Sequence, residues 1–465
     1  MGNFTSEPSA PVLQAKKSLF LTEDEQISLH QLYTSTVDND SVARVFDASD
    51  KDIFRSALLP YFRRHINTYD QFEDFVVSCT RSASDKIIGT FWGMILEDTT
   101  VGTKEALLRL SQVIFELSLP REQLDDIVKH EVATEMVNFF VTNFFVHGMD
   151  VNNATHASVT PLLLTALNNY LPHAHKALET YISRLCFRGM HSPSYKPFVA
   201  PALDFPSEVL PLSHLLPLAL HSDALQGAWK RLYSTSTDGM SFNRIVYHSL
   251  GYDGPTCVLV KCADPAGTVL GMLSHDHWKE SNRFYGKNIL FLSFKRRIFH
   301  TKCFALTHYT GTGSSKNALF VLAPNLRVYR SKSGGNGAYQ WLNSKSITHP
   351  RGMGFGGTVE GFRVFIPESL EGCTAANSCP TYETGKLVDG ETFEIQTLEV
   401  WGCGGAEVVA AALAAQANDR AITDETIRRA RQVDKAQFFN NEFDKEFLLS
   451  HTMTQTSRDR TGHQS

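Results

Sequence analysis

Two histidines next to an aspartate are the first residues whose spacing could do chemistry. His275 and His277 flank Asp276, and side chains two positions apart on a strand share one face, as a metal site would require. No HExxH or CxxC motif and no third ligand at a recognisable spacing accompanies them. We therefore expect a histidine pair on a surface loop, with no metal ion and no cofactor.

A glycine-rich run has the spacing of a nucleotide-binding loop. Gly352, Gly354 and Gly357 fit GxGxxG, a motif that holds phosphate only where a helix follows it. Here a strand-like apolar segment follows at 362–367. The run therefore predicts a tight turn between strands that only glycine permits.

Eight cysteines are scattered along the chain without a CxxC pair or a secretory signal peptide, which indicates reduced thiols in the cytosol. They are Cys79, Cys186, Cys257, Cys262, Cys303, Cys373, Cys379 and Cys403. We expect Cys257, Cys262, Cys373, Cys379 and Cys403 to fill core positions as small apolar residues.

Glu399 is the carboxylate of greatest interest. Strand alternation places it on the face opposite Leu398 and Val400, beside glycine-rich turns whose backbone amides it could accept. Three roles are possible for this carboxylate: it caps the turns, it contacts a partner protein, or it takes part in catalysis. Because no paired acid, base or nucleophile stands at a legible spacing, the sequence predicts a protein that is not an enzyme.

Size and charge limit the classes of function. A chain of 465 residues is long enough for two or three domains, and 42% hydrophobic with 20% charged residues is ordinary for a globular protein. A net charge of -5 gives no cationic field for nucleic acid, so we expect no nucleic-acid partner. No window supplies the roughly 18 apolar residues that a membrane-spanning helix needs.

Periodicity divides the chain into a helical part and a strand-rich part, which predicts an α+β fold. Residues 19–188 read as six or seven amphipathic helices, the first preceded by Thr22 as N-cap. Helix pairs of this kind resemble EF-hands, but the candidate loops at 38–41 and 47–50 lack the required glycine, so any calcium sites are degenerate. A proline-rich stretch at 189–211 predicts a linker, and glycine-separated strands at 212–404 predict an antiparallel β-sandwich.

The pattern returns to helix at 405–449, before a disordered tail at 450–465. Phe439, Phe443 and Phe447 recur every four residues, which places three rings on one helix face. This face either packs on the protein's own sandwich or enters a groove on a partner. Arg428 and Arg429, on the same helix, are further candidate partner contacts.

The N-terminus, a disordered stretch at 1–18, predicts a lipid anchor. Met1 to Ser6 fit the MGxxx[ST] pattern, in which Gly2 is myristoylated after Met1 is removed. A chance Met-Gly start on a disordered tail is the alternative. One myristoyl chain binds membranes only marginally, so a protein partner on the membrane surface would be the second anchor.

The middle of the chain resembles the TLDc domain family. The similarity opens at Leu232 to Phe242, with Ser234, Asp238 and Gly239, and continues through the Phe-Tyr-Gly turn that ends at Gly286. It ends with Leu398 to Trp401, after the glycine-rich run that includes Gly354, Gly356 and Gly357. These ordered matches cover 212–404 and imply an antiparallel β-sandwich that binds a protein partner.

The remaining features resemble the myristoylated, lysosomal, mTOR-associated branch of that family, which has an EF-hand-like N-terminal region. That branch implies binding to subunits of the vacuolar proton-pumping ATPase on the cytosolic face of lysosomal or vacuolar membranes. It also implies roles in oxidative-stress protection and growth signalling. Two rival readings stay open, a thiol-dependent antioxidant with Cys403 as the reactive group and a soluble signalling adaptor.

The sequence departs from the family's pattern at 287–310. In the family, a glycine and the next core strand follow the Phe-Tyr-Gly turn within a few residues. Here the added residues combine apolar side chains with Lys295, Arg296 and Arg297 and have no turn chemistry of their own. We hypothesise a retained intron or an error of the gene structure, with a real loop or extra strand as the alternative.

Overall fold

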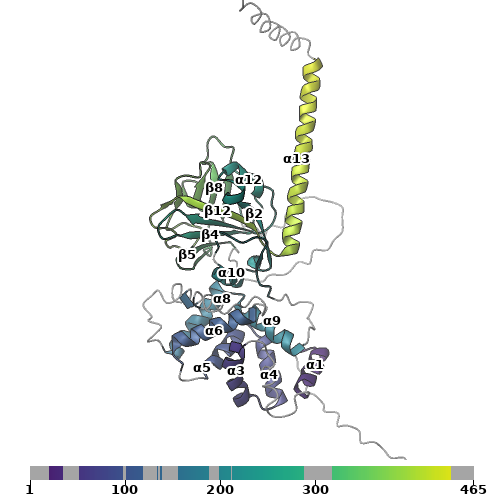
Figure 1. The fold of residues 1–465 in the computed structure, drawn as a ribbon, viewed down its shortest axis with the longest axis vertical. Coiled ribbons are helices and arrows are strands. Elements are labelled where there is room, and N and C mark those ends of the chain that lie inside the picture. The colour runs from purple at the N-terminus through teal and green to yellow at the C-terminus, as the bar shows by residue number, and fades with distance from the viewer. Residues whose placement is uncertain are drawn as a thin grey trace, which may run out of the picture.

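The computed structural model describes residues 20–34, 52–97, 101–118, 134, 137–138, 155–187, 198–210, 212–286 and 317–440. Gly2, the two candidate calcium loops, the segment 287–310, Phe443 and Phe447 lie outside these ranges, so the structure leaves the predictions made for them open. Figure 1 shows a helical part, a strand-rich part and one long helix.

The N-terminal part is helical, as predicted. Its helices are α1 (Glu23–Thr34), α3 (Asp52–His65), α4 (Tyr69–Thr80), α5 (Ser84–Leu96), α6 (Thr103–Ser118), α8 (His156–Tyr170) and α9 (Ala174–Phe187). Thr22 caps α1 as expected, accepting from the Glu25 amide at 3.3 Å while the Glu25 carboxylate accepts from the Thr22 amide at 2.9 Å. Helix α9 contacts α1, α4, α5 and α6 and so forms the centre of this part.

The strand-rich part is a two-layer sandwich, which confirms the α+β prediction. One sheet has seven strands in the order β1-β2-β12-β3-β4-β5-β6, and the other has five in the order β11-β10-β9-β8-β7. All neighbouring strands are antiparallel except β1 and β2, which are parallel. The strands are β1 (Ala202–Leu203), β2 (Ala228–Ser234), β3 (Thr256–Cys262), β4 (Val269–Ser274), β5 (Ala318–Ala323), β6 (Arg327–Arg330), β7 (Gln340–Asn343), β8 (Gly352–Thr358), β9 (Gly361–Pro367), β10 (Cys373–Ala375), β11 (Thr392–Phe393) and β12 (Ile395–Gly402).

The predicted linker at 189–211 is only partly a linker. Its described end contributes β1 to the seven-stranded sheet, and Val209 and Leu210 are buried. The proline-rich composition concealed these contacts because a two-residue strand has too few positions to show alternation. Helix α10 (Leu212–His221) and the 3₁₀ turn Asp223–Leu225 then lead into β2.

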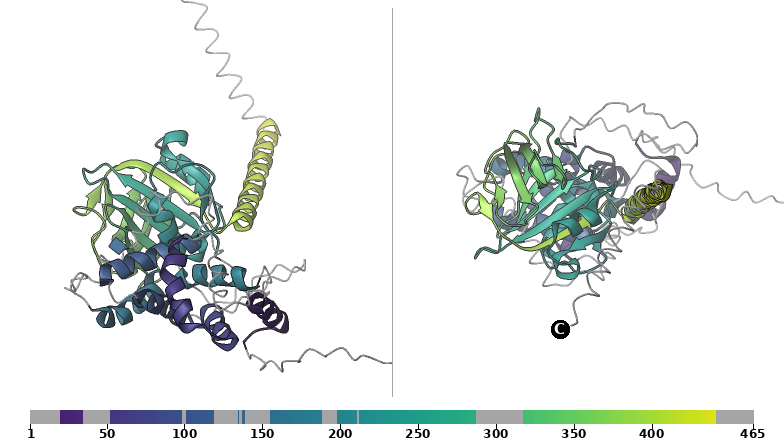
Figure 2. Two further views of the ribbon diagram at one scale, coloured as in Figure 1. Left: turned by 60° about the horizontal axis from the view of Figure 1, so that its bottom comes forward. Right: turned by 90° about the horizontal axis from the view of Figure 1, so that it is seen from above.

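The seven-stranded sheet is buried on both faces. Along β3, Val258 and Val260 belong to the core between the two sheets, whereas Cys257 and Leu259 belong to a second core. That second core is continuous from the outer face of the sheet through α10 into the helical part. Figures 1 and 2 show the helical part lying under the sandwich on this side.

Polar contacts fix this junction between the two parts. The Arg330 guanidinium lies over the Tyr170 ring at 4.4 Å, and the His221 ring nitrogen Nδ1 lies 2.7 Å from the Tyr170 carbonyl oxygen. The His173 amide donates to the Leu220 carbonyl at 3.0 Å. The helical part and the outer face of the seven-stranded sheet therefore share one hydrophobic core. Hydrogen bonds and a cation–π contact fix their relative position at its edge.

A further helix, α13 (Ala406–Asn440), follows β12 and spans 35 residues. It begins beside β2 and reaches beyond the sandwich, as Figure 1 and the left view of Figure 2 show. Among the described helices, none is both long and apolar enough to span a bilayer.

Candidate functional site

The residues that open the strand-rich motif form a capped turn. Ser234 ends β2 and caps the short helix α11 (Thr235–Asp238), and its amide donates to the Asp238 carboxylate at 2.9 Å. Gly239 follows with φ +80°, and its carbonyl accepts from the Tyr233 hydroxyl at 2.7 Å. Phe242 is buried in the sandwich core at the start of α12 (Phe242–Ser249). These motif residues hold the fold rather than present reactive groups.

Glu399 is fully buried and acts as a cap. Its Oε2 accepts from the Ser207 hydroxyl at 2.6 Å and from the Trp401 indole at 2.9 Å, while Oε1 accepts from the Glu208 amide at 2.9 Å. The Ser207 hydroxyl in turn accepts from the Leu210 amide at 2.8 Å. Glu399 therefore caps the segment Ser207–Leu210 before α10, and not a glycine-rich turn as the sequence predicts.

The prediction that the glycine-rich run is a turn is wrong, because Gly352–Thr358 is strand β8. The glycines provide room for aromatic neighbours. A Cβ on Gly354 would lie 2.5 Å from the Phe362 ring, and one on Gly356 would lie 2.6 Å from the Tyr382 ring. Gly357 has φ +104°, and a Cβ there would lie 2.2 Å from the Gly361 carbonyl oxygen. The period-2 pattern was hidden because glycine has no apolar side chain to display it.

The histidine pair lies just beyond β4 and is partly buried. Nδ1 of His275 lies 3.2 Å from Oδ1 of Asn317, whose Nδ2 donates to the Asp276 carboxylate at 3.2 Å. His277 instead faces Asp253 at 3.6 Å, so the two imidazoles do not converge. Within the described ranges, no three His, Cys, Asp or Glu side chains gather as metal ligands would.

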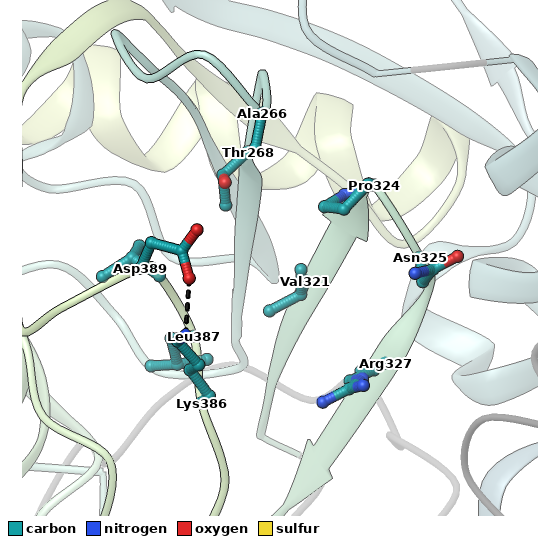
Figure 3. A pocket seen from close by; sticks show the side chains of 10 residues that line it. Ala266, Thr268, Val321, Pro324, Asn325, Arg327, Lys386, Leu387 and Asp389 are labelled. Atoms are coloured by element: carbon teal, nitrogen blue, oxygen red, sulfur yellow. Dashed lines mark ion pairs between the residues drawn. The ribbon is translucent and has the colours of Figure 1, made fainter.

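A shallow cavity of about 160 Å³ lies at one end of the seven-stranded sheet. Figure 3 shows Thr268, Val321, Arg327 and the ion pair between Lys386 and Asp389, 2.5 Å apart, around it. Thr268 already donates to Asp264 at 2.5 Å. Lys386 and Asp389 are paired with each other, which leaves Arg327 as the remaining charged group of the lining. An arginine without a partner acid, base or nucleophile makes no catalytic set, so we interpret this cavity as a surface depression.

Cys403, the candidate reactive thiol, is fully buried. Its Sγ contacts the Trp401 carbonyl at 3.7 Å, and burial raises the pKa of the thiol well above its usual range. A buried neutral thiol is a poor nucleophile, because the thiolate is the reactive form. The structure therefore offers no support for Cys403 as a reactive group.

Helix α13 has two different halves. In the first, Val409, Ala412 and Gln416 are buried, and the Gln416 amide donates to the carbonyls of His248 at 3.0 Å and Leu250 at 2.8 Å. Arg420 closes this half, donating to the Tyr247 carbonyl with its guanidinium 4.5 Å from the Tyr247 ring. Sequence analysis missed this attachment, because the alanine-rich stretch shows little hydrophobic periodicity.

Beyond Arg420 almost all described side chains of α13 are exposed to solvent. From Ala421 to Gln432 every side chain except that of Glu425 is exposed, including Ile422 at 57% and Ile427 at 44%. Arg428 and Arg429 each bind Glu425 of the same helix, at 2.7 and 2.8 Å. Phe439 lies in α13, but its side chain is outside the described set, as are Phe443 and Phe447.

Comparison with known proteins shows that the sandwich is similar to one family. The TLDc domain family matches residues 207–312 and 305–404, so the match divides near the departure from the family's pattern. Its start at 207 includes Ser207 and Glu208, the partners of Glu399.

The similar proteins carry two names. MTOR-associated protein MEAK7 of Xenopus laevis is 30% identical over 243 residues, which are 52% of this chain and 43% of that protein. Its counterpart in Danio rerio is 31% identical over 206 residues, 44% of this chain and 36% of that protein. Oxidation resistance protein 1 of Xenopus laevis is 24% identical over 203 residues, 43% of this chain and 19% of that protein. The chain thus matches less than half the length of these curated relatives.

Proposed function

We infer that this chain, a member of the TLDc family that resembles MEAK7, is a non-catalytic protein whose outer surface and C-terminal helix bind a protein partner. The observation that carries this inference is the unsupported half of α13. Most helical stability in proteins comes from packing of one helix face against other elements, rather than from the intrinsic propensity of the residues. Among the described side chains beyond Arg420, those of 421–432 are exposed except that of Glu425, so a partner surface would supply packing that the sandwich does not.

The partner that we propose is the peripheral sector of the vacuolar proton-pumping ATPase, on the cytosolic face of lysosomal or vacuolar membranes. The resemblance to MEAK7 supports this choice, together with an exposed helix suited to a groove. Myristoylation of Gly2 would add the membrane contact. The names of the relatives further support a link to mTOR signalling or to oxidative-stress resistance.

Truncation after Arg420 gives the sharpest test. This variant keeps Val409, Ala412, Gln416 and Arg420, so the sandwich and the start of α13 should retain their thermal stability. We expect recovery of pump subunits from purified membranes to fall at least tenfold relative to the full chain. The matched control is Glu391→Gln, an exposed change on the sandwich, which should leave recovery unchanged. Undiminished recovery by the truncated protein would refute the role of the helix.

The membrane contact is tested separately. A Gly2→Ala variant removes the acyl acceptor, and we expect less of it to sediment with membranes while binding to detergent-solubilised pump subunits stays intact. If the variant sediments with membranes as the wild type does, myristoylation of Gly2 does not contribute.

A further inference from the structure

The loop between β7 and β8 carries the most exposed large apolar side chain of the described residues. Ile347 is 100% exposed, whereas the other exposed apolar side chains keep part of their surface covered. The loop consists of residues 344–351, because Asn343 and Gly352 are the last pair of the hairpin. Single exposed apolar residues are common on protein surfaces. The meaning of this one therefore depends on the loop that presents it.

Contacts at both ends hold this loop in place. At its start, the Glu280 carboxylate accepts from the Ser344 amide at 3.0 Å and also binds the Ser344 hydroxyl. At its end, the Trp341 indole donates to the Pro350 carbonyl at 3.2 Å. The exposed position of Ile347 is therefore set by the contacts of its neighbours.

The loop also satisfies its own backbone amides. Oδ1 of Asn343 accepts from the amides of Lys345 at 3.2 Å and Ser346 at 2.9 Å. The Ser346 hydroxyl oxygen accepts from the amides of Thr348 at 3.2 Å and His349 at 3.1 Å. An amide without a partner is costly wherever water is scarce. These amides would keep their hydrogen bonds where the loop meets an apolar medium.

Two exposed cations accompany Ile347. Lys345 lies in the loop, and Arg283 follows Asn282, whose Oδ1 accepts from Nδ2 of Asn343 at 2.8 Å. The turn at 280–283 therefore lies against the loop. Among the described residues, neither cationic side chain takes part in an ion pair or a hydrogen bond. Neither is thus aimed at one particular partner group.

The charge of this region is positive, although the whole chain carries -5. Arg351, at the end of the loop, is paired with Glu368 at 3.0 Å. Four basic side chains lie here against two acidic ones, a net charge of +2: Lys279, Arg283, Lys345 and Arg351 against Glu280 and Glu368. An exposed aliphatic side chain and unpaired cations therefore occur together on one fixed loop.

We propose that this loop binds an anionic lipid surface, with Ile347 in the bilayer interface and Lys345 and Arg283 against the headgroups. An aliphatic side chain is stabilised when it leaves water, and each cation near an anionic surface adds attraction. A protein pocket would also take an isoleucine, but cations without fixed partners suit a surface that offers many negative charges. This contact is separate from the proposed binding to the proton pump and uses neither Gly2 nor α13.

The test uses the full chain, produced without an acyl group, and vesicles of equal parts phosphatidylcholine and phosphatidylserine. We expect the chain to sediment with these vesicles at low salt, and less with vesicles of phosphatidylcholine alone. Ile347→Ser should lower the partition coefficient about tenfold, because the aliphatic group no longer leaves water. Lys345→Gln should lower it about fivefold on the anionic vesicles and leave binding to neutral vesicles unchanged.

A fluorescent side chain reports entry into the bilayer directly. Ile347→Trp should bind the anionic vesicles, shift its emission to shorter wavelength and be quenched by lipids with brominated acyl chains, since tryptophan favours the membrane interface. The matched control is Met240→Ser, which removes another exposed apolar side chain of the same sandwich and should leave vesicle binding unchanged.

Three results would overturn the proposal. The full chain fails to sediment with the anionic vesicles, Ile347→Ser sediments as the wild type does, or brominated lipids leave the emission of Ile347→Trp unquenched. If Ile347→Ser keeps vesicle binding but loses binding to purified pump subunits, the loop contacts a protein, and the lipid proposal is again overturned.

Discussion

Gly286 and Asn317, the residues at either end of the segment 287–316, lie against the same carboxylate. Asn317 donates to Oδ2 of Asp276 at 3.2 Å, and a Cβ built on Gly286 would lie 2.4 Å from that same atom. The two ends of the segment are therefore close neighbours in space. A connection of a few residues would be long enough to join them.

We accordingly predict that deletion of residues 287–310 leaves the sandwich folded and makes it more stable. The deletion shortens the connection from 30 to 6 residues, and loop closure costs roughly 0.6 kcal/mol per doubling of length, or about 1.4 kcal/mol here. Thermal unfolding should show a midpoint higher by a few degrees. A lower midpoint, or an insoluble product, would mean that these residues belong to the fold.

The origin of the segment is a separate question that sequencing of the transcript answers. If the segment is a retained intron, mature messages should join the codon for Gly286 directly to that for Gly311. Spliced messages that all encode 287–310 would contradict this hypothesis. They would support a real loop or extra strand.

The buried carboxylate of Glu399 leads to a prediction about stability. In Glu399→Gln one oxygen becomes an amide group that cannot accept, so at least one of the donors from Ser207, Glu208 and Trp401 loses its partner. We expect the free energy of unfolding to fall by about 2–3 kcal/mol, since hydrogen bonds to charged groups are worth about that much. Denaturant unfolding measures the change.

The control for this variant is Glu391→Gln, which changes an exposed carboxylate of the same sandwich. It should alter the unfolding free energy by less than about 0.5 kcal/mol. Equal effects of the two substitutions would show that the Glu399 cap contributes nothing special to stability.

The Gln416 amide leads to a prediction about α13. Gln416→Ala removes two donors from the carbonyls of His248 and Leu250 and leaves both carbonyls without this partner. We expect amide hydrogen exchange in the first half of α13 to accelerate by roughly tenfold, which corresponds to about 1.4 kcal/mol. Gln432→Ala, an exposed change on the unsupported half, should leave that exchange unchanged.

Sequence periodicity predicted the helices, the strands and the sandwich because these elements bury side chains at regular spacings. It did not predict the contacts that close the structure. Glu399 is 192 positions from Ser207, and Gln416 is 168 positions from His248. A pairing over such distances leaves no local pattern. Strand β8 was likewise mistaken for a turn. Its glycines are there because the rings of Phe362 and Tyr382 occupy the space that a side chain would need, and that reason is not visible in the local sequence.

The same limit applies to the candidate sites. The motif residues Ser234, Asp238 and Gly239 lie in one turn, and their hydrogen bonds show that this turn supports the fold. Ile347 was not identified at all. In sequence it is one apolar residue among polar neighbours, and only the structure shows that its side chain is fully exposed on a loop with bonded amides.

The junction between the helical part and the sandwich should weaken in acid. Burial lowers the pKa of His173 to about 3 and that of His175, His214 and His221 to about 4, from an ordinary value of 6.5. The positive charge of Lys176 lowers the pKa of His173 and His175 further, and that of Arg330 does the same for His221. The negative charge of Asp223 opposes the change at His173.

A lowered histidine pKa means that the folded form holds these rings neutral while the unfolded chain binds protons below about pH 6.5. Their contribution to stability is therefore complete above pH 6.5 and is lost as the pH falls from 6.5 towards 4. We expect the unfolding free energy, measured with denaturant at a series of pH values, to decrease over this range. His175→Gln removes one titrating group and should make the decrease shallower, whereas His30→Gln, at an exposed position of α1, should not change it. A stability that stays flat from pH 6.5 to 4.5 would contradict the expected loss of stability from these histidines.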